Sequence, residues 1–303
     1  MIKKFILLCF LFLQVKTAHC QELQNNSPYI QGGVSGTQYY LPHFKYGDDS
    51  GKNAVDLGNK DHFGAGFYLA LGYPLPKHEK HIFEANGYYR FLHHKKHPNI
   101  PSGSTFAPID TQDTLLLLGS TFEDTLKFGI QNGSFQFLWL MQYPYHTPLL
   151  GFCYNYLMND YHLKLHIDKI SLMKLKEKLE SNFYGLMIGD RVFVPLYAGL
   201  YLTLDLSFAV FYSTYHLRAK QLSPFLSDIL VTKKKEFCQE KLEGSLGFQY
   251  NFSRVKLKLE CDCEHYFQMP TIKNPKTFDD KAISIKKGQG TFLTALLSAV
   301  FSF

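Results

Sequence analysis

Apolar residues alternate with polar or small residues along several long segments of the chain. The clearest is 198–216, where one face is almost wholly apolar and the other carries Asp205 among glycine, hydroxyl and small side chains. A period of two is that of a β-strand, whose successive side chains point to opposite faces. A one-sided apolar strip of this length exceeds the usual globular strand and fits a tilted membrane crossing. The pattern therefore predicts long strands with one face in lipid.

The same alternation recurs along the chain. It is clear in 241–252 and 255–268, weaker in 63–73, 81–91, 131–143, 149–158, 183–194 and 290–303, and least certain in 29–40. We expect about ten strands, within a range of roughly eight to twelve. The upper figure applies if residues 115–118 belong to an extra strand pair.

The links between these segments are sorted by length. Short links alternate with long ones, the short ones being 73–81, 143–147, 194–198 and 251–254, and the long ones 41–62, 92–130, 159–182, 217–240 and 269–289. Short periplasmic turns alternating with long outer loops are typical of bacterial outer-membrane barrels, and an even strand number leaves both termini in the periplasm. A secreted β-sandwich has no reason to sort its loops in this way. The sequence therefore predicts an all-β transmembrane antiparallel barrel of the bacterial outer membrane.

The link 159–182 has a pattern of its own. Past Met158 the apolar positions change phase, to Tyr161, Leu163 and Leu165. This predicts a β-bulge near residues 159–160 and a barrel wall that continues above the membrane. Residues 170–180 are rich in helix formers, and both a short amphipathic helix and an irregular charged loop fit them.

The beginning of the sequence indicates export. Lys3 and Lys4 precede an apolar stretch, 5–15, that is too short to span a bilayer as a helix, and small residues favour cleavage after Cys20. Lipidation of Cys20 is the less favoured alternative. We expect a signal peptide at 1–20 and one barrel domain at 21–303.

Composition is compatible with this architecture. The chain is 46% hydrophobic and 16% aromatic with a mean hydropathy of −0.15, as expected for alternating strands joined by polar loops. The net charge of +6 comes partly from 233–235 and 93–96, which we assign to loops. Solvated loops are the favoured interpretation of these runs, and contact with lipopolysaccharide phosphates is the alternative. No nucleic-acid module accompanies them.

Charged residues recur on the faces predicted to point inward. The face of 255–268 opposite its apolar one carries five consecutive ionisable residues, which need water or partners. The predicted lumen-facing charges are Glu84, Arg90, Asp190, Asp205, Lys256, Lys258, Glu260, Asp262 and Glu264. Because both signs are present, these groups could line a hydrated path or close the bore as an ion-paired plug.

The four cysteines outside the signal peptide add little chemistry. If Tyr250 pairs with Leu257 across the turn, Cys261 faces Leu246, and both Cys261 and Cys263 lie on the lipid face. A metal site formed by these thiols and His265 is disfavoured on an apolar face. We expect them to pack as small hydrophobes, and we expect no metal and no cofactor.

Catalysis has to be considered because some outer-membrane barrels are enzymes. Asp48 with Asp49 and Asp279 with Asp280 offer paired carboxylates, and several histidines lie in predicted loops. Adjacent acidic residues in a loop are usually solvated turns, and no serine and histidine suggest a nucleophile with its base. The sequence therefore favours a protein that is not an enzyme.

Two resemblances to known proteins accompany these patterns. The last strand ends on Phe301 and Phe303 and resembles the closing strand of outer-membrane barrels, which implies an assembly signal read by the barrel-assembly machinery. The segments 182–191 and 63–73, with Pro195, are similar to the Legionella-type pore-forming major outer-membrane proteins, also found in Coxiella-like and chlamydia-like bacteria. The chain departs from that family in its single tryptophan and its inserted Asp190. This resemblance implies a pore.

The sequence thus favours an outer-membrane pore or channel for small hydrophilic solutes or ions. The alternative is a structural or adhesive surface barrel that does not conduct. The expected partners are outer-membrane lipid and lipopolysaccharide, the barrel-assembly machinery and the solutes, and no nucleic acid.

Overall fold

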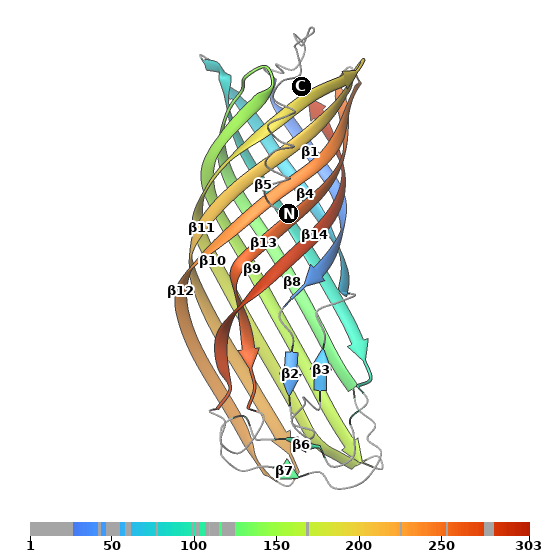
Figure 1. The fold of residues 1–303 in the computed structure, drawn as a ribbon, viewed down its shortest axis with the longest axis vertical. Coiled ribbons are helices and arrows are strands. Elements are labelled where there is room, and N and C mark those ends of the chain that lie inside the picture. The colour runs from blue at the N-terminus through green and yellow to red at the C-terminus, as the bar shows by residue number, and fades with distance from the viewer. Residues whose placement is uncertain are drawn as a thin grey trace, which may run out of the picture.

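The structure is a computed structural model that describes residues 27–41, 44–46, 55–57, 62–76, 78–98, 100, 104–106, 109, 115–116, 125–167, 170–224, 226–252, 254–275 and 282–303. Ten long strands form one closed barrel in which every neighbouring pair is antiparallel (Figure 1). The predicted all-β barrel of about ten strands is confirmed. The predicted signal peptide lies outside the described residues and stays a prediction.

The wall follows the chain order and is closed by pairing of its first and last strands. Its strands are β1 (Tyr29–Tyr40), β4 (His62–Leu75), β5 (His78–Lys96), β8 (Thr125–Met141), β9 (His146–Ile167), β10 (Ile170–Tyr197), β11 (Leu200–Ser223), β12 (Leu226–Phe252), β13 (Val255–Lys273) and β14 (Ser284–Ser302). Two short sheets pair β2 (Phe44–Tyr46) with β3 (Val55–Leu57) and β6 (Thr105–Phe106) with β7 (Leu115–Leu116). Residues 115–116 therefore do not add a strand to the wall.

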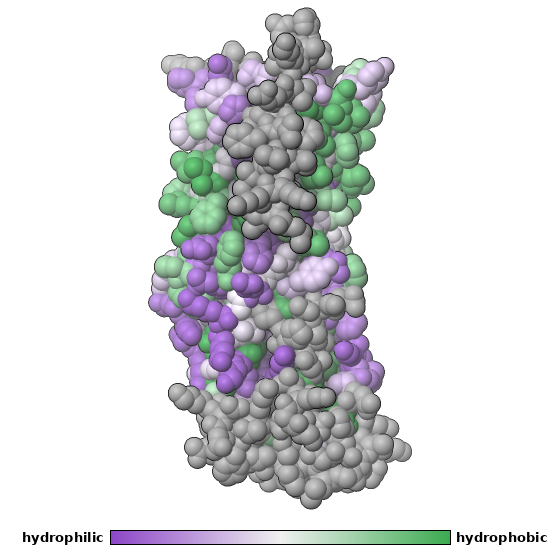
Figure 2. Space-filling view, viewed as in Figure 1, coloured by the Kyte–Doolittle hydropathy of each residue, from purple (hydrophilic) through white to green (hydrophobic). Residues whose placement is uncertain are grey.

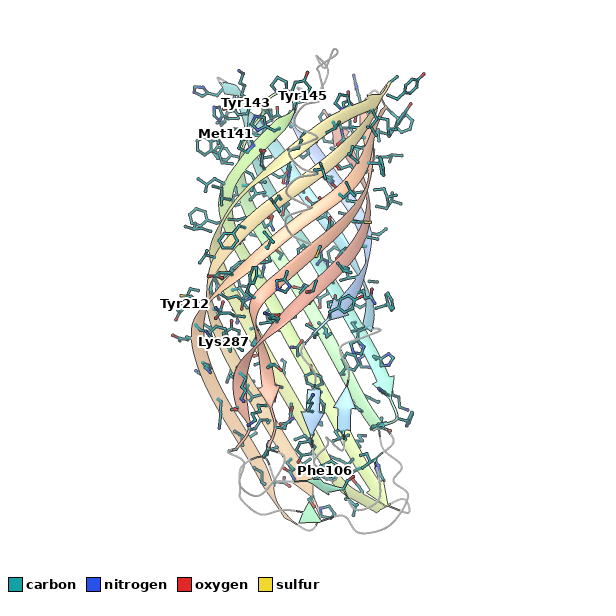
Figure 3. All side chains as sticks on the ribbon, in the orientation of Figure 1. Phe106, Met141, Tyr143, Tyr145, Tyr212 and Lys287 are labelled. Carbon is teal, nitrogen blue, oxygen red and sulfur yellow. The ribbon has the colours of Figure 1, made fainter. Side chains whose placement is uncertain are left out.

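Several wall strands are much longer than a membrane crossing requires. Strand β10 has 28 residues and β12 has 27, whereas about ten tilted residues span a bilayer. The exposed apolar residues gather in a band near the short turns, and more hydrophilic surface lies beyond it (Figure 2). Met141, Tyr143 and Tyr145 mark the turn end, and Phe106 lies near the other end (Figure 3). The barrel thus has a half with a lipid-type surface and an extension with a polar surface.

Many residues that the sequence assigned to long loops belong to the wall. Residues 170–180 form the start of β10, paired with β9 on one side and β11 on the other, so both the helix and the irregular loop were wrong. Pairing on both edges outweighs the weak helix preference of the segment. The runs 93–96 and 233–235 likewise lie in β5 and β12.

The predicted bulge near Asn159 is also wrong. Strand β9 pairs with β8 and β10 without a register shift at that point. Instead the apolar residues change face, because Phe152 is exposed on the outside while Leu163 and Leu165 are buried inside. In the lipid half the apolar environment is outside the wall. In the extension water is outside and the apolar environment is within.

The inside of the extension holds a hydrophobic core. The ring of Phe44 on β2 stacks on Tyr161 of the wall at 4.6 Å, and the ring of Tyr46 lies 5.3 Å from that of Phe106. The backbone N–H of Ile109 donates to Oε1 of buried Gln221 at 3.0 Å. Described residues from the β1–β4 and β5–β8 connections therefore fill the bore in the extension.

The described part of the chain contains no helix that is long and apolar enough to cross a membrane.

Candidate functional site: the charged lumen

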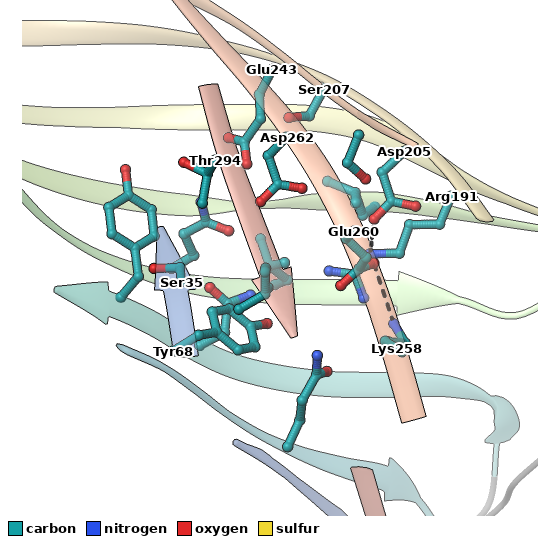
Figure 4. Close-up of a pocket in the computed structure, with 18 of the residues that line it drawn as sticks. Ser35, Tyr68, Arg191, Asp205, Ser207, Glu243, Lys258, Glu260, Asp262 and Thr294 are labelled. Carbon is teal, nitrogen blue, oxygen red and sulfur yellow. Dashed lines mark ion pairs between the residues drawn. The ribbon is translucent and has the colours of Figure 1, made fainter. Parts of the chain in front are cut away.

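The candidate site is the lumen of the lipid half. Two cavities of about 100 Å³ and about 90 Å³ lie there, and Gln31, Arg191 and Lys258 line both of them. Figure 4 shows the larger cavity, with Arg191 and Asp205 beside Lys258 and Glu260. The two cavities therefore adjoin each other, and these three polar side chains lie where they meet.

Strict alternation along β13 aims its charges inward. Leu257, Leu259, Cys261 and Cys263 are exposed on the outer face, whereas the residues between them are buried or half-buried. On the paired strand β12, Gly247 faces Glu260. A Cβ added to Gly247 would lie 2.7 Å from Cγ of Glu260, so the glycine leaves room for the charged side chain.

One cluster of charges lies nearer the short turns. The guanidinium of Arg191 on β10 binds buried Glu84 on β5 with both terminal nitrogens, at 3.0 and 3.2 Å. Its Nε lies 3.4 Å from Oδ2 of Asp205. Tyr29 and Asn86 also donate to the Glu84 carboxylate. Because β8 and β9 separate β5 from β10 in the barrel order, this arginine ties together non-adjacent parts of the wall.

A second cluster lies toward the extension and crosses the bore. The carboxylate of Glu264 on β13 accepts from Arg90 of β5 and from the hydroxyl of Tyr88 at 2.8 Å. The ammonium of Lys241 lies 3.6 Å from Glu264 and 2.7 Å from Glu243. Arg90, Lys241 and Glu264 are all almost completely buried. A buried pair of this kind is strongly destabilising to break, since one partner is left as an uncompensated charge.

The other predicted lumen charges are less tightly held. The Lys258 ammonium lies 3.8 Å from Glu260. Asp262 lines the larger cavity and Lys256 the smaller, and the described residues make no hydrogen bond or ion pair with either side chain. The structure thus places every predicted lumen charge except Asp190 inside the wall. Glu84, Arg90, Asp205 and Glu264 belong to the two clusters.

Asp190 does not belong to this set. Its neighbours Gly189 and Arg191 face inward, so Asp190 faces outward, where its side chain is 44% exposed and lies 3.2 Å from Nδ1 of His146. The prediction that Asp190 faces the lumen was wrong, because it is the residues immediately before and after it that face inward. Lys241 was not predicted as a site residue, although the alternation of 241–252 already placed it on the face of Glu243.

A layer of buried aromatic rings lies beyond the second cluster, toward the extension. The ring of Phe183 on β10 lies 5.9 Å from that of Tyr266 on β13, and Tyr266 lies 5.5 Å from Phe292. The hydroxyl of Tyr266 accepts a 2.9 Å hydrogen bond from Asn155 on β9. Since β11 and β12 separate β10 from β13, the contacts of Tyr266 with Phe183 and Asn155 run across the bore, whereas its contact with Phe292 joins the neighbouring strands β13 and β14. The layer therefore joins opposite sides of the wall above the charges.

The cysteine register agrees with the prediction. Tyr250 pairs with Leu257, Leu246 with Cys261 and Gly244 with Cys263. Cys238, Cys261 and Cys263 are exposed, and Cys153 is buried. Within the described residues, no three histidine, cysteine or acidic side chains are grouped to hold a metal ion.

Two groups of candidate site residues remain, the C-terminal phenylalanines and the acidic pairs. Phe301 faces outward and is 47% exposed, and the backbone N–H of Phe303 donates to the carbonyl of Pro28 at 3.0 Å. The assembly role of these two residues stays a prediction. The acidic pairs at 48–49 and 279–280, considered for catalysis, lie outside the described residues.

Comparison with known proteins establishes the fold alone. No family model and no curated protein matches the sequence. The outer-membrane protease OmpT from Escherichia coli is similar in structure, with a TM-score of 0.50 and 8% identity over 95% of this chain and 99% of that one. The toluene transporter TodX from P. putida matches with a TM-score of 0.28 and 7% identity over 91% and 90% of the two chains. The monoaromatic hydrocarbon channel CymD gives 0.32 and 10% over 95% of each. The chain therefore has the fold of bacterial outer-membrane β-barrels.

Proposed function

We propose that the protein is a surface barrel of the bacterial outer membrane whose lumen is closed. The short turns and both termini face the periplasm, and the polar extension stands outside the cell. The exposed apolar band and the sorting of link lengths support this orientation. Phe301 and Phe303 would serve the barrel-assembly machinery during insertion.

The observation that carries the proposal is the closure of the bore at two levels. Glu264 is held from the opposite side of the barrel by Arg90, and the Phe183–Tyr266 contact runs across the lumen beyond it. Opening the first level leaves buried charges unpaired, and opening the second exposes packed rings to water. A closed barrel of this kind acts through its outer surface, in a structural or adhesive role.

A pore for small hydrophilic solutes or ions is the second candidate. The adjoining polar cavities favour it, because Asp262 and Lys256 provide charges of both signs that the described residues do not pair. The similarity to the pore-forming major outer-membrane proteins also favours it. Conduction would require the aromatic layer and the core of the extension to move aside.

Planar bilayers distinguish the two candidates. We expect refolded wild-type protein, shown to be inserted by its heat-modifiable mobility, to give no reproducible conductance steps. A known porin reconstituted in the same way is the control for the bilayer. Small, regular steps from the wild type would establish the pore and reject the closed barrel. In that event E260Q with D262N should shift selectivity toward anions, because pore-lining carboxylates favour cations.

A further inference from the structure

Outside the wall, the extension carries an unbroken row of basic side chains. The cross-strand pairs Lys95 with Lys127, Lys127 with His162, His162 with Lys176, and Lys176 with Lys220 run over five neighbouring strands, from β5 to β11. We call these five residues the basic row. All five face outward, and the four lysines are exposed. No single segment of the sequence shows the row, because each strand contributes one residue.

One adjacent row adds positive charge, and the other carries charges of both signs. Lys164 pairs with Lys174 on one side, and Lys178 pairs with Arg218 on the other. The described acids nearest the row each contact a basic group, and Glu180 lies 2.6 Å from Lys178. Asp160 lies 2.9 Å from His162, and Asp228 lies 3.9 Å from Lys220.

Two lysines of the row, one on each side of His162, lack counter-charges among the described residues. The described residues make no ion pair with Lys127 or Lys176. Like charges directly opposite one another on paired strands are destabilising. A surface that places several in one line gains stability from an anion with many charges that bridges them.

The distance of the basic row from the apolar band indicates which kind of anion can reach it. Tyr184 and Tyr212 pair at the edge of the apolar band, and Tyr212 points outward from the wall (Figure 3). Lys176 lies eight residues beyond Tyr184 on the same strand, which is about 26 Å by strand rise and about 20 Å along the membrane normal at a tilt near 40°. Phospholipid headgroups form a layer only several Å deep. The phosphates must therefore stand well out from the membrane.

We propose that the basic row binds the phosphorylated saccharide of lipopolysaccharide in the outer leaflet. The ammonium groups would contact its phosphates in place of their missing counter-charges. The outer surface of the extension around the basic row would then be in contact with glycolipid and not with bulk water alone. This proposal rests on the orientation given under the proposed function, with the extension outside the cell.

The test is the binding of phosphorylated rough lipopolysaccharide to the folded full-length barrel in detergent, which does not depend on whether the barrel conducts. Each lysine near an anionic membrane surface contributes enough that the triple variant K127Q/K176Q/K220Q should bind about a hundredfold more weakly than wild type. The control K80Q/R254Q/K286Q removes three exposed charges away from the row and should bind as wild type does.

Two ligand controls identify the source of the phosphate. Enzymatically dephosphorylated lipopolysaccharide should bind wild type as weakly as the row variant binds the intact glycolipid. Inorganic phosphate at the same phosphate concentration should not displace the glycolipid. Equal binding by the row variant and the control variant would overturn the proposal, and so would equal binding of the dephosphorylated glycolipid or displacement by inorganic phosphate.

Discussion

At the scale of single residues, the lumen separates charges that stabilise the fold from charges that do not. Glu264 lies between Arg90 and Lys241, and all three are buried. We expect E264Q to lower the free energy of unfolding by about 3–5 kcal/mol, because two cations lose their shared carboxylate. Urea unfolding in detergent micelles, followed by the fluorescence of the single tryptophan Trp139, measures this value.

Asp262, two residues away on the same face, is the matched control. Since the described residues make no ion pair with its side chain, D262N leaves no buried cation unpaired and should not lower the free energy of unfolding. Equal losses from E264Q and D262N would show that the cross-barrel cluster does not hold the fold together.

Glu177 gives a pH-dependent prediction at the same scale. It lies inside the extension, where burial raises its pKa to about 8, and its one hydrogen bond in this part of the structure comes from Asn274 at 3.3 Å. In the unfolded chain a glutamate ionises near pH 4.3, so between about pH 4.3 and 8 the folded state binds the extra proton. Stability should therefore fall by about 1.4 kcal/mol per pH unit across this window and level off above pH 8.

The isosteric variant E177Q isolates this contribution. Its free energy of unfolding should lack that slope and should exceed the wild-type value at pH 8, as measured by urea unfolding at a series of pH values. Identical pH profiles for wild type and E177Q would mean that Glu177 is already ionised in the folded barrel.

At the scale of strands, the sequence predicted which segments are extended but not where the wall ends. The alternation of 149–158 predicts β9 correctly, whereas the phase change after Met158 predicts a bulge that the strand does not have. The pairing of β9 continues there without a register shift. What changes is the side of the wall on which the apolar surroundings lie, outside in the lipid half and inside in the extension. A period of two reveals which residues share a face, but a sequence does not state whether lipid lies outside or an apolar core lies inside.

Residues 233–235 belong to the wall strand β12, so their number sets its register. Deleting the three residues shifts the rest of the strand by an odd number and exchanges its lipid and lumen faces. We expect this deletion to reduce the amount of barrel in the outer membrane at least tenfold, as deletion of Phe303 should. Replacing the same three lysines by glutamine keeps the register and should leave the amount near wild type. Quantitative blotting of membrane fractions measures all three variants. A deletion variant that assembles normally would contradict the assignment of this run to the wall.

At the scale of the whole molecule, the barrel, its strand number and its turn register could all be predicted, because each depends on alternation and on neighbouring segments. The individual contacts across the lumen could not, because the partners in contacts such as Arg90 with Glu264 and Phe183 with Tyr266 come from strands far apart in the sequence. The basic row could not be predicted for the same reason, because each of its members belongs to a different strand.

The native cysteines test the proposed closure of the lumen without any measurement of current. Cys153 is buried on the inner face of β9, whereas Cys261 and Cys263 are exposed on the lipid face of β13. In a C238S/C261S/C263S variant, Cys153 is the single cysteine outside the predicted signal peptide. If the bore is closed at the level of the charge clusters, a charged, membrane-impermeant maleimide should label the folded barrel at least a hundredfold more slowly than the urea-unfolded chain. The reciprocal variant C153S/C238S should react with a lipid-soluble maleimide through Cys261 and Cys263 while folded. Rapid labelling of folded Cys153 by the charged reagent would show water passing through the lumen and would favour the pore.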